Sequence, residues 1–252
     1  MEKITAFSIK YGFLIVMGGS FLFFGLAQPA FWSWSNMFSI LLGVTVYAIL
    51  AMGITFTLVI DGLDLSVGSV AAMSVMIASY TMVVMDLGGV VAFIVCLLLG
   101  ALLGLINGLL IVRIKIPDLL ATLGMMFLIQ GLQLIPSGGR SIGTGMMLEN
   151  GEEAEGMFSE GFLYLGQGRL FGLVPIPVIF MIVMAIIVYL ILDHTRWGRV
   201  LYAIGGNPEA ARLAGANVDR YKIMAYVASG TISALGGILL AARVGRGDVS
   251  SG

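Results

Sequence analysis

The chain has 252 residues, of which 59% are hydrophobic and 11% charged, and its formal net charge at pH 7 is −1. Soluble domains carry about 25% charged residues, so this chain has too few charges to cover a water-exposed surface. The net charge gives no reason to expect nucleic acid as a partner, and the single cysteine, Cys96, excludes an internal disulfide and a cysteine zinc cluster. We therefore expect an integral membrane protein.

Apolar runs long enough to cross a membrane recur along the chain. A spanning helix needs about 20 apolar residues, because the hydrocarbon core is roughly 30 Å thick and each residue rises about 1.5 Å. Helices are expected rather than barrel strands, because the runs lack strict alternation. The sequence thus predicts an all-α, polytopic helical membrane protein with about seven spans, at residues 11–27, 38–60, 67–85, 88–112, 119–135, 174–192 and 223–242.

The positions of Lys and Arg predict how these spans are oriented. Basic residues occur before the first span, after the fourth span and in the segment 193–222. With a cytoplasmic amino terminus, all three regions lie inside, in agreement with the positive-inside rule. The segment 136–173 is then an extracytoplasmic loop, and its acidic residues are Glu149, Glu152, Glu153, Glu155 and Glu160.

The fourth predicted span carries a stripe of small residues. Gly100, Gly104 and Gly108 recur every four residues, so they lie on one helical face and allow another backbone to approach closely. Asn107 lies beside the stripe and can hydrogen-bond across helices. We interpret the stripe as a packing face rather than a ligand site.

The segment after the sixth span predicts a helix of only about two turns. Asn207 suits the N-cap, and Pro208 suits the first helical position. Glu209 favours the positive end of the helix dipole, and Gly215 can adopt the left-handed conformation that ends a helix. The small apolar residues Ala210, Ala211, Leu213 and Ala214 suit insertion into a partner's groove. The residues alone leave a second interpretation open, a connector that lies on the lipid head groups.

Three motifs resemble those of one transporter family. Glu209, Ala210, Ala211 and Gly215 form E-A-A-x-x-x-G, which resembles the cytoplasmic loop by which permeases of bacterial ABC importers contact their ATPase. The longer stretch YAIGGNPEAARLAG resembles permeases of the ribose, xylose and galactose group, as do DGLDLSVGS at 61–69 and INGLLIVRIKIPDLLATLG at 106–124. One departure is Asp118, where relatives often carry an aromatic residue.

The resemblance covers most of the chain from the second span onward. It implies the permease of an ATP-driven, binding-protein-dependent importer of a sugar or polyol in the bacterial cytoplasmic membrane. The implied partners are an ATP-binding subunit, an extracytoplasmic substrate-binding protein, a second permease subunit (identical or a sister chain) and membrane lipid. The ATPase would couple at Asn207, Pro208, Glu209, Ala210, Ala211 and Gly215, which makes 193–222 a cytoplasmic coupling loop. Relatives continue with further spans, so 1–252 is expected to be one transmembrane domain that is truncated at its carboxy terminus after a polar, uncapped tail.

The acidic break between the second and third spans has two interpretations. At the membrane surface, Gly62 would make the turn and Asp64 or Ser66 would cap the next helix, and simple alternation of the spans favours this. Alternatively, the break is re-entrant, and its carboxylates accept hydrogen bonds from the hydroxyls of a sugar. The candidate residues of the solute path are then Asp61, Asp64, Ser66, Asn107 and Thr122.

Residues for chemistry are missing from the sequence. All four lysines follow a residue other than glycine, so no P-loop is present, and the sole histidine, His194, has no cluster of metal ligands around it. We expect no enzyme activity, no metal and no cofactor, with ATP hydrolysed on a separate subunit. The alternative function is a secondary transporter or channel for a small polar solute. Such proteins usually carry ionisable residues inside their spans, whereas the charges here cluster at span ends.

Overall fold

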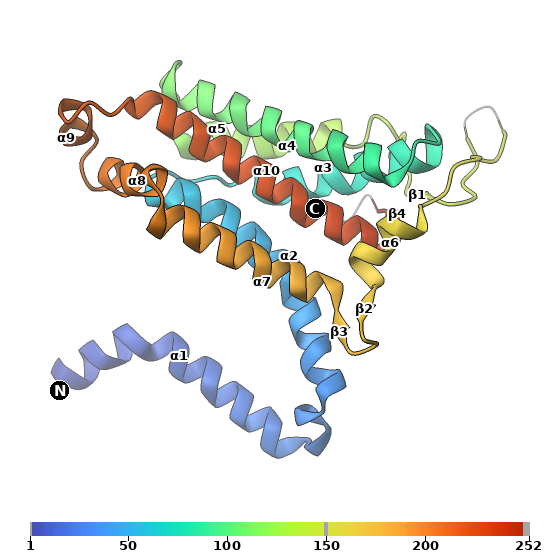
Figure 1. Ribbon diagram of the computed structural model, residues 1–252, viewed down its shortest axis with the longest axis horizontal. Helices are drawn as coiled ribbons and strands as arrows, with labels where there is room; N and C mark the ends of the chain where they lie inside the picture. Colours follow the sequence, from blue (N-terminus) through green and yellow to red (C-terminus); the bar gives the residue numbers. More distant parts are fainter. Residues whose placement is uncertain (1, 149–150, 249–252) are drawn as a thin grey trace. The chain divides into compact units, whose positions relative to one another are not determined.

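The structure is a computed structural model that describes residues 2–148 and 151–248, without the side chains of residues 2–10. Glu149 and the tail 249–252 therefore lie outside the described residues. The chain divides into two compact units, residues 1–43 and 44–252. Figure 1 shows that both are built from α-helices joined by loops.

The first unit holds α1 (Glu2–Ala27), the short 3-10 helix η1 (Pro29–Trp32) and the beginning of α2 (Trp34–Val59). The ring of Phe31 packs against those of Phe21 and Phe24, with centroids 5.5 and 6.2 Å apart. Trp32 and Trp34 are largely exposed. Exposed tryptophans at a span end suit the interface between membrane and water.

The second unit contains the rest of α2 and the remaining helices. These are α3 (Val67–Ser79), the π-helix η2 (Tyr80–Val84), α4 (Gly89–Val112), α5 (Asp118–Leu132), α6 (Glu160–Gln167), α7 (Ile176–Tyr189), the π-helix η3 (Leu190–His194), α8 (Arg196–Gly206), α9 (Pro208–Leu213) and α10 (Val218–Val244). Two small antiparallel sheets accompany them. β1 (Ile142–Gly143) pairs with β4 (Arg246–Gly247), and β2 (Arg169–Leu170) pairs with β3 (Val174–Pro175).

Every predicted span is an apolar helix in the structure. Among the residues that the structure describes, five helices are long and apolar enough to cross a membrane, and they run over Trp34–Val59, Val67–Val84, Gly89–Val112, Ile176–His194 and Val218–Val244. Two further apolar helices, Tyr11–Ala27 and Asp118–Leu132, are shorter. The predicted all-α, polytopic membrane fold is therefore confirmed, with five clear spans and two short candidates.

Helix α10 packs against α3, α4 and α6 (Figure 1). The glycine stripe of α4 faces it, because a Cβ on Gly104 would clash with the backbone carbonyl of Tyr226. A Cβ on Gly100 would likewise meet the carbonyl of Gly230, which is itself in α10. The predicted packing role of the stripe is confirmed, since only glycine allows two backbones to approach so closely.

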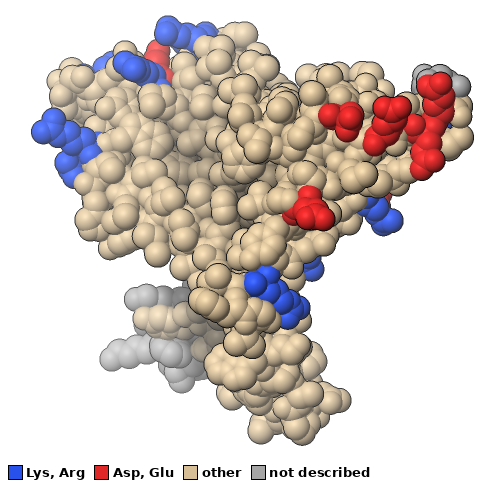
Figure 2. Space-filling model, turned by 45° about the vertical axis from the view of Figure 1, so that its right-hand side comes forward, with Lys and Arg blue, Asp and Glu red and all other residues tan. Residues whose placement is uncertain are grey.

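The loops of the second unit gather at two opposite ends. At the first, which we call the basic end, the break after α2, the α4–α5 loop and the start of α10 line one pocket. At the other, the acidic end, β1 from the segment after α5 meets β4 from the segment after α10. Figure 2 shows mainly Lys and Arg on the upper left and mainly Asp and Glu on the upper right, with further Lys and Arg below the acidic group. The sorting of charge agrees with the predicted alternation of loops.

The acidic end is more ordered than a plain loop. The segment 152–158 is extended, with Ala154, Gly156 and Phe158 buried while Glu153, Glu155 and Met157 are exposed. The eight-residue α6 follows it and was not predicted. The polar tail also differs from expectation, because Gly245 ends α10 in the left-handed conformation at φ 67° and the next two residues form β4.

Candidate functional site

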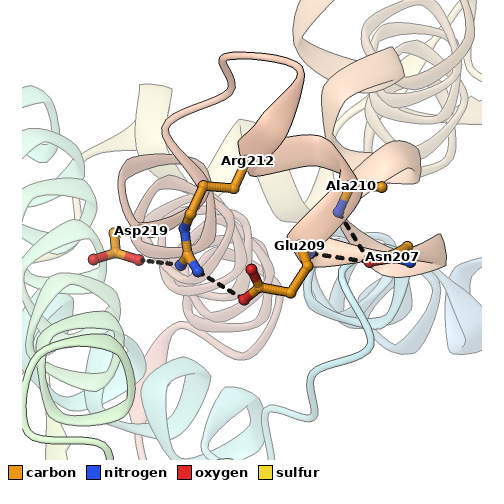
Figure 3. Close-up of polar contacts among 5 residues, drawn as sticks. All are labelled: Asn207, Glu209, Ala210, Arg212 and Asp219. Carbon is orange, nitrogen blue, oxygen red and sulfur yellow. Dashed lines mark hydrogen bonds and ion pairs between the residues drawn. The ribbon is translucent and has the colours of Figure 1, made fainter.

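The short helix α9 forms where the sequence predicts it. The Asn207 side-chain oxygen accepts hydrogen bonds from the backbone N–H groups of Glu209 and Ala210, both at 3.0 Å (Figure 3). Pro208 takes the first helical position, and Gly215 lies at φ +89° just past the end. The helix has six residues and its N-cap satisfies two donors that would otherwise be unpaired.

Helix α9 has an inner and an outer side. Ala211 is buried in the same apolar cluster as Leu201 and Val218, so it anchors α9 to its own protein. This corrects the expectation that Ala211 enters a partner's groove. Glu209, Ala210 and Leu213 point outward, and Leu213 is 89% exposed. We call Glu209, Ala210 and Leu213 the outer face of α9.

Arg212 connects α9 to the first turn of α10. Its guanidinium donates to Glu209 at 2.8 Å and lies 3.5 Å from a carboxylate oxygen of Asp219 (Figure 3). Pairs this exposed stabilise a protein by at most about 1 kcal/mol each. Backbone hydrogen bonds reinforce them, including one from the N–H of Ala216 to the carbonyl of Ala211 at 3.0 Å. Residues 214–217 are therefore a tight connection between the two helices.

The acidic break places its two carboxylates in different surroundings. Asp61 is exposed in a turn at φ 57°, as the surface interpretation expects. Asp64 is only 2% exposed, so that interpretation is wrong for this residue. One of its oxygens accepts from the N–H and hydroxyl of Ser66, at 3.0 and 2.6 Å. The other accepts from the hydroxyl of Ser229 in α10 at 2.8 Å.

Asn107 extends these contacts into α4. Its side-chain N–H donates to the hydroxyl of Ser66 at 2.9 Å, which confirms the predicted hydrogen bond across helices. Its side-chain oxygen is buried and has no hydrogen-bond partner in the described part of the chain. We call Asp64, Ser66, Asn107 and Ser229 the buried polar network. It joins the break before α3 to α4 and α10.

The structure brings only three of the five predicted solute-path residues together, namely Asp64, Ser66 and Asn107. Thr122 is buried in α5 and donates to the carbonyl of Asp118, one turn earlier in its own helix, at 2.8 Å. Asp61 lines a pocket of about 290 Å³ at the basic end, with Lys115 and Lys222. Among the described residues, no group of three His, Cys, Asp or Glu side chains could hold a metal ion.

Two contributing residues were not predicted. Ser229 lies 165 positions after Asp64, and nothing in its own helix distinguishes it from the other small residues of α10. Asp118 accepts a hydrogen bond from the N–H of Leu63 at 2.7 Å and so fixes the break against α5. The sequence marked Asp118 only as an acidic residue at a position where the similar permeases often carry an aromatic one.

The fold and the capped, exposed α9 together define a membrane-spanning transport permease. Residues 36–252 match the model of the family described as "Branched-chain amino acid transport system / permease component", and the chain belongs to this family. It is a permease component of an ABC importer and a multi-pass protein of the bacterial cytoplasmic membrane.

Curated relatives agree with that assignment. The ribose import permease protein RbsC of Escherichia coli K12 is 35% identical over 89% of this chain and 67% of its own length. The L-arabinose transport system permease protein AraH of the same strain is 38% identical over 95% of this chain and 68% of its own. The RbsC protein of Bacillus subtilis is 35% identical over 90% and 66%. This chain thus spans about two thirds of their length, and no solved structure matches it.

Proposed function

We propose that this permease imports a sugar or related polyol, with ATP hydrolysed on a separate subunit that docks on the outer face of α9. The observation that carries the proposal is the build of α9. A six-residue helix is too short to be stable alone in water, yet here it is capped, anchored and turned outward. The relatives RbsC and AraH are ribose and arabinose permeases, which supports a sugar as the solute.

We propose a separate place on the second unit for each predicted partner. We propose that the basic end faces the cytoplasm and meets the ATPase at 193–222. The acidic end, with the loop 136–173, then faces outward and receives solute from a substrate-binding protein. A second permease subunit, identical or a sister chain, would complete the pathway, since the apolar spans leave large faces for lipid or another subunit.

Alternating access follows from these contacts. Closure of the ATPase subunits on ATP would pull α9, and the tight connection at 214–217 would pass that displacement to α10. The chain breaks no bond in the solute, so its role is mechanical. Within the pathway, Asp61 and Thr122 remain predicted solute contacts.

Reconstituted vesicles test this function. The chain is co-expressed with an ATPase subunit and a substrate-binding protein of the same importer group, and uptake of labelled ribose, arabinose and inositol is measured. We expect uptake that needs both internal ATP and external binding protein. Uptake that follows an ion gradient without ATP would support a secondary transporter instead, and chemically altered solute would support an enzyme.

The outer face of α9 is tested by charge reversal. Glu209→Lys places a cation beside Arg212 on an exposed surface, so it should leave the permease in the membrane while weakening co-purification of the ATPase. Glu155→Lys, an exposed glutamate at the acidic end, is the matched control. Equal ATPase recovery with both variants would contradict docking on α9.

A further inference from the structure

Docking of an ATPase on α9 does not explain the hydrogen bonds of the buried polar network. We propose that the hydrogen bond between Ser229 and Asp64 is the link that transmits movement of α10 to the break before α3. Ser229 and Asp64 then act as positioning residues that couple ATP hydrolysis to opening of the pathway. The inference rests on the proposed function and adds the internal route by which force from α9 reaches the other helices.

The first step of the route is the joint between α9 and α10. Arg212 contacts both Glu209 and Asp219, and the intervening residues are held by backbone hydrogen bonds. Asn217 also caps α10 by accepting from the N–H of Arg220 at 3.1 Å. A displacement of α9 must therefore move the start of α10 with it.

The second step runs along α10 to Ser229. The helix is continuous from Val218 to Val244, so it moves as a rod. Its contact with α4 is made largely by glycine against backbone, as at Gly104 and Tyr226. Such contacts hold the two helices close together but are non-directional, so they do not fix how α10 is aligned with the break before α3.

The third step is the directional bond. Ser229 is fully buried and donates to Asp64 at 2.8 Å, across an interface without bulk water. A hydrogen bond to a buried carboxylate is stronger than one in water and constrains both distance and angle. Asp64 in turn holds the backbone N–H of Ser66, the residue that precedes α3. Movement of α10 therefore acts directly on the beginning of α3.

The network is built as a link rather than as a sugar subsite. Both carboxylate oxygens of Asp64 already accept hydrogen bonds from protein groups. The hydroxyl of Ser66 is likewise occupied, because it donates to Asp64 and accepts from Asn107. The side-chain oxygen of Asn107 is an unused acceptor. When α10 shifts, a donor can reach this oxygen, so the hydrogen bonds of the network can rearrange.

Coupling stoichiometry tests the proposal. The complete transporter, with ATPase and binding protein, is reconstituted with Ser229→Ala, and sugar transported per ATP hydrolysed is measured. Ser233→Ala is the control, because Ser233 is also fully buried in α10 but donates only to the carbonyl of Ser229. We expect Ser229→Ala to retain ATP hydrolysis and ATPase binding while sugar per ATP falls severalfold, because α10 can then move without moving the break before α3. The control should keep the native ratio.

A second measurement covers the case in which Ser229→Ala yields too little complex for transport. Gly68→Cys, in the exposed first turn of α3 where a Cβ meets nothing within 4 Å, is introduced into a Cys96→Ser background, and its labelling by a maleimide is compared with and without ATP. We expect ATP to change the labelling rate with Ser229 present and to have no effect with Ser229→Ala. An unchanged ATP response, or an unchanged ratio of sugar to ATP, would overturn the link. Absence of ATP-dependent uptake with the native chain would instead overturn the proposed function, and the link with it.

Discussion

Gly104 of α4 lies directly against the backbone carbonyl of Tyr226 in α10, with no room for a side chain between them. The same relationship repeats one turn away at Gly100 and Gly230. The principal helix pair of the second unit is therefore held by backbone proximity, which in a membrane replaces the hydrophobic driving force available in water.

This contact predicts the effect of adding one methyl group. Gly104→Ala must push α4 away from a rigid backbone, so we expect a loss of about 1 to 3 kcal/mol of stability and a lower yield of folded protein. Thermal unfolding in detergent measures the loss. Gly131→Ala in α5, where a Cβ meets no atom within 4 Å, should leave the melting temperature unchanged or slightly raised. Equal melting temperatures for the two variants would contradict close α4–α10 packing.

The end of α9 depends on a left-handed residue. Gly215 has open space around a Cβ but lies at φ +89°, so Gly215→Val is strained by the backbone alone, by roughly 1 to 2 kcal/mol. We expect normal membrane insertion and reduced co-purification of the ATPase. Gly206→Val, at an equally open site without positive φ, is the control. Full ATPase recovery with Gly215→Val would show that the turn is not needed for docking.

The beginning of α9 depends on its cap. Asn207→Ala removes the acceptor for two backbone donors, which typically costs about 1 kcal/mol and should let a six-residue helix fray. Asn207→Asp restores an acceptor and should restore ATPase binding. Proteolysis by trypsin at Arg212 reports the fraying, and identical cleavage rates for the Ala and Asp variants would argue against the cap.

Chemical labelling can test which side of the membrane the basic end and the acidic end each face. Cys96 is fully buried, so the native chain should react negligibly with an impermeant maleimide. Leu213→Cys should react only in inside-out vesicles, and Met157→Cys only from the outside of spheroplasts. Both positions are exposed, which removes burial as an explanation for failure. Labelling of Leu213→Cys from outside would reverse the proposed topology.

Local features of the fold follow from the sequence because they depend on neighbouring residues. The cap at Asn207, the left-handed Gly215 and the glycine stripe of α4 are all encoded within a few positions. The lengths of the apolar runs likewise predict where the long helices lie. Two short helices, α6 and α8, were not predicted, because their 8 and 11 residues are too few and too amphipathic to register as a span.

The interior of the site depends on contacts between distant segments, and there prediction fails. Alternation of the spans placed the whole break at the surface, yet only Asp61 is exposed, while Asp64 turns inward. Its burial is tolerable because Ser229 supplies a donor from 165 residues away. A single serine among the small residues of α10 gives no sign of that role until the helices are packed.

The extended segment 152–158 has one side that packs on the protein and another that faces outward. Its inward residues, Ala154, Gly156 and Phe158, pack against the core, whereas Glu153, Glu155 and Met157 are exposed. Exchange of Glu153, Glu155 or Met157 can therefore alter the surface that we propose for the substrate-binding protein, with little effect on folding. Mutations at alternate positions of this segment can thus change the partner that binds while the fold is kept.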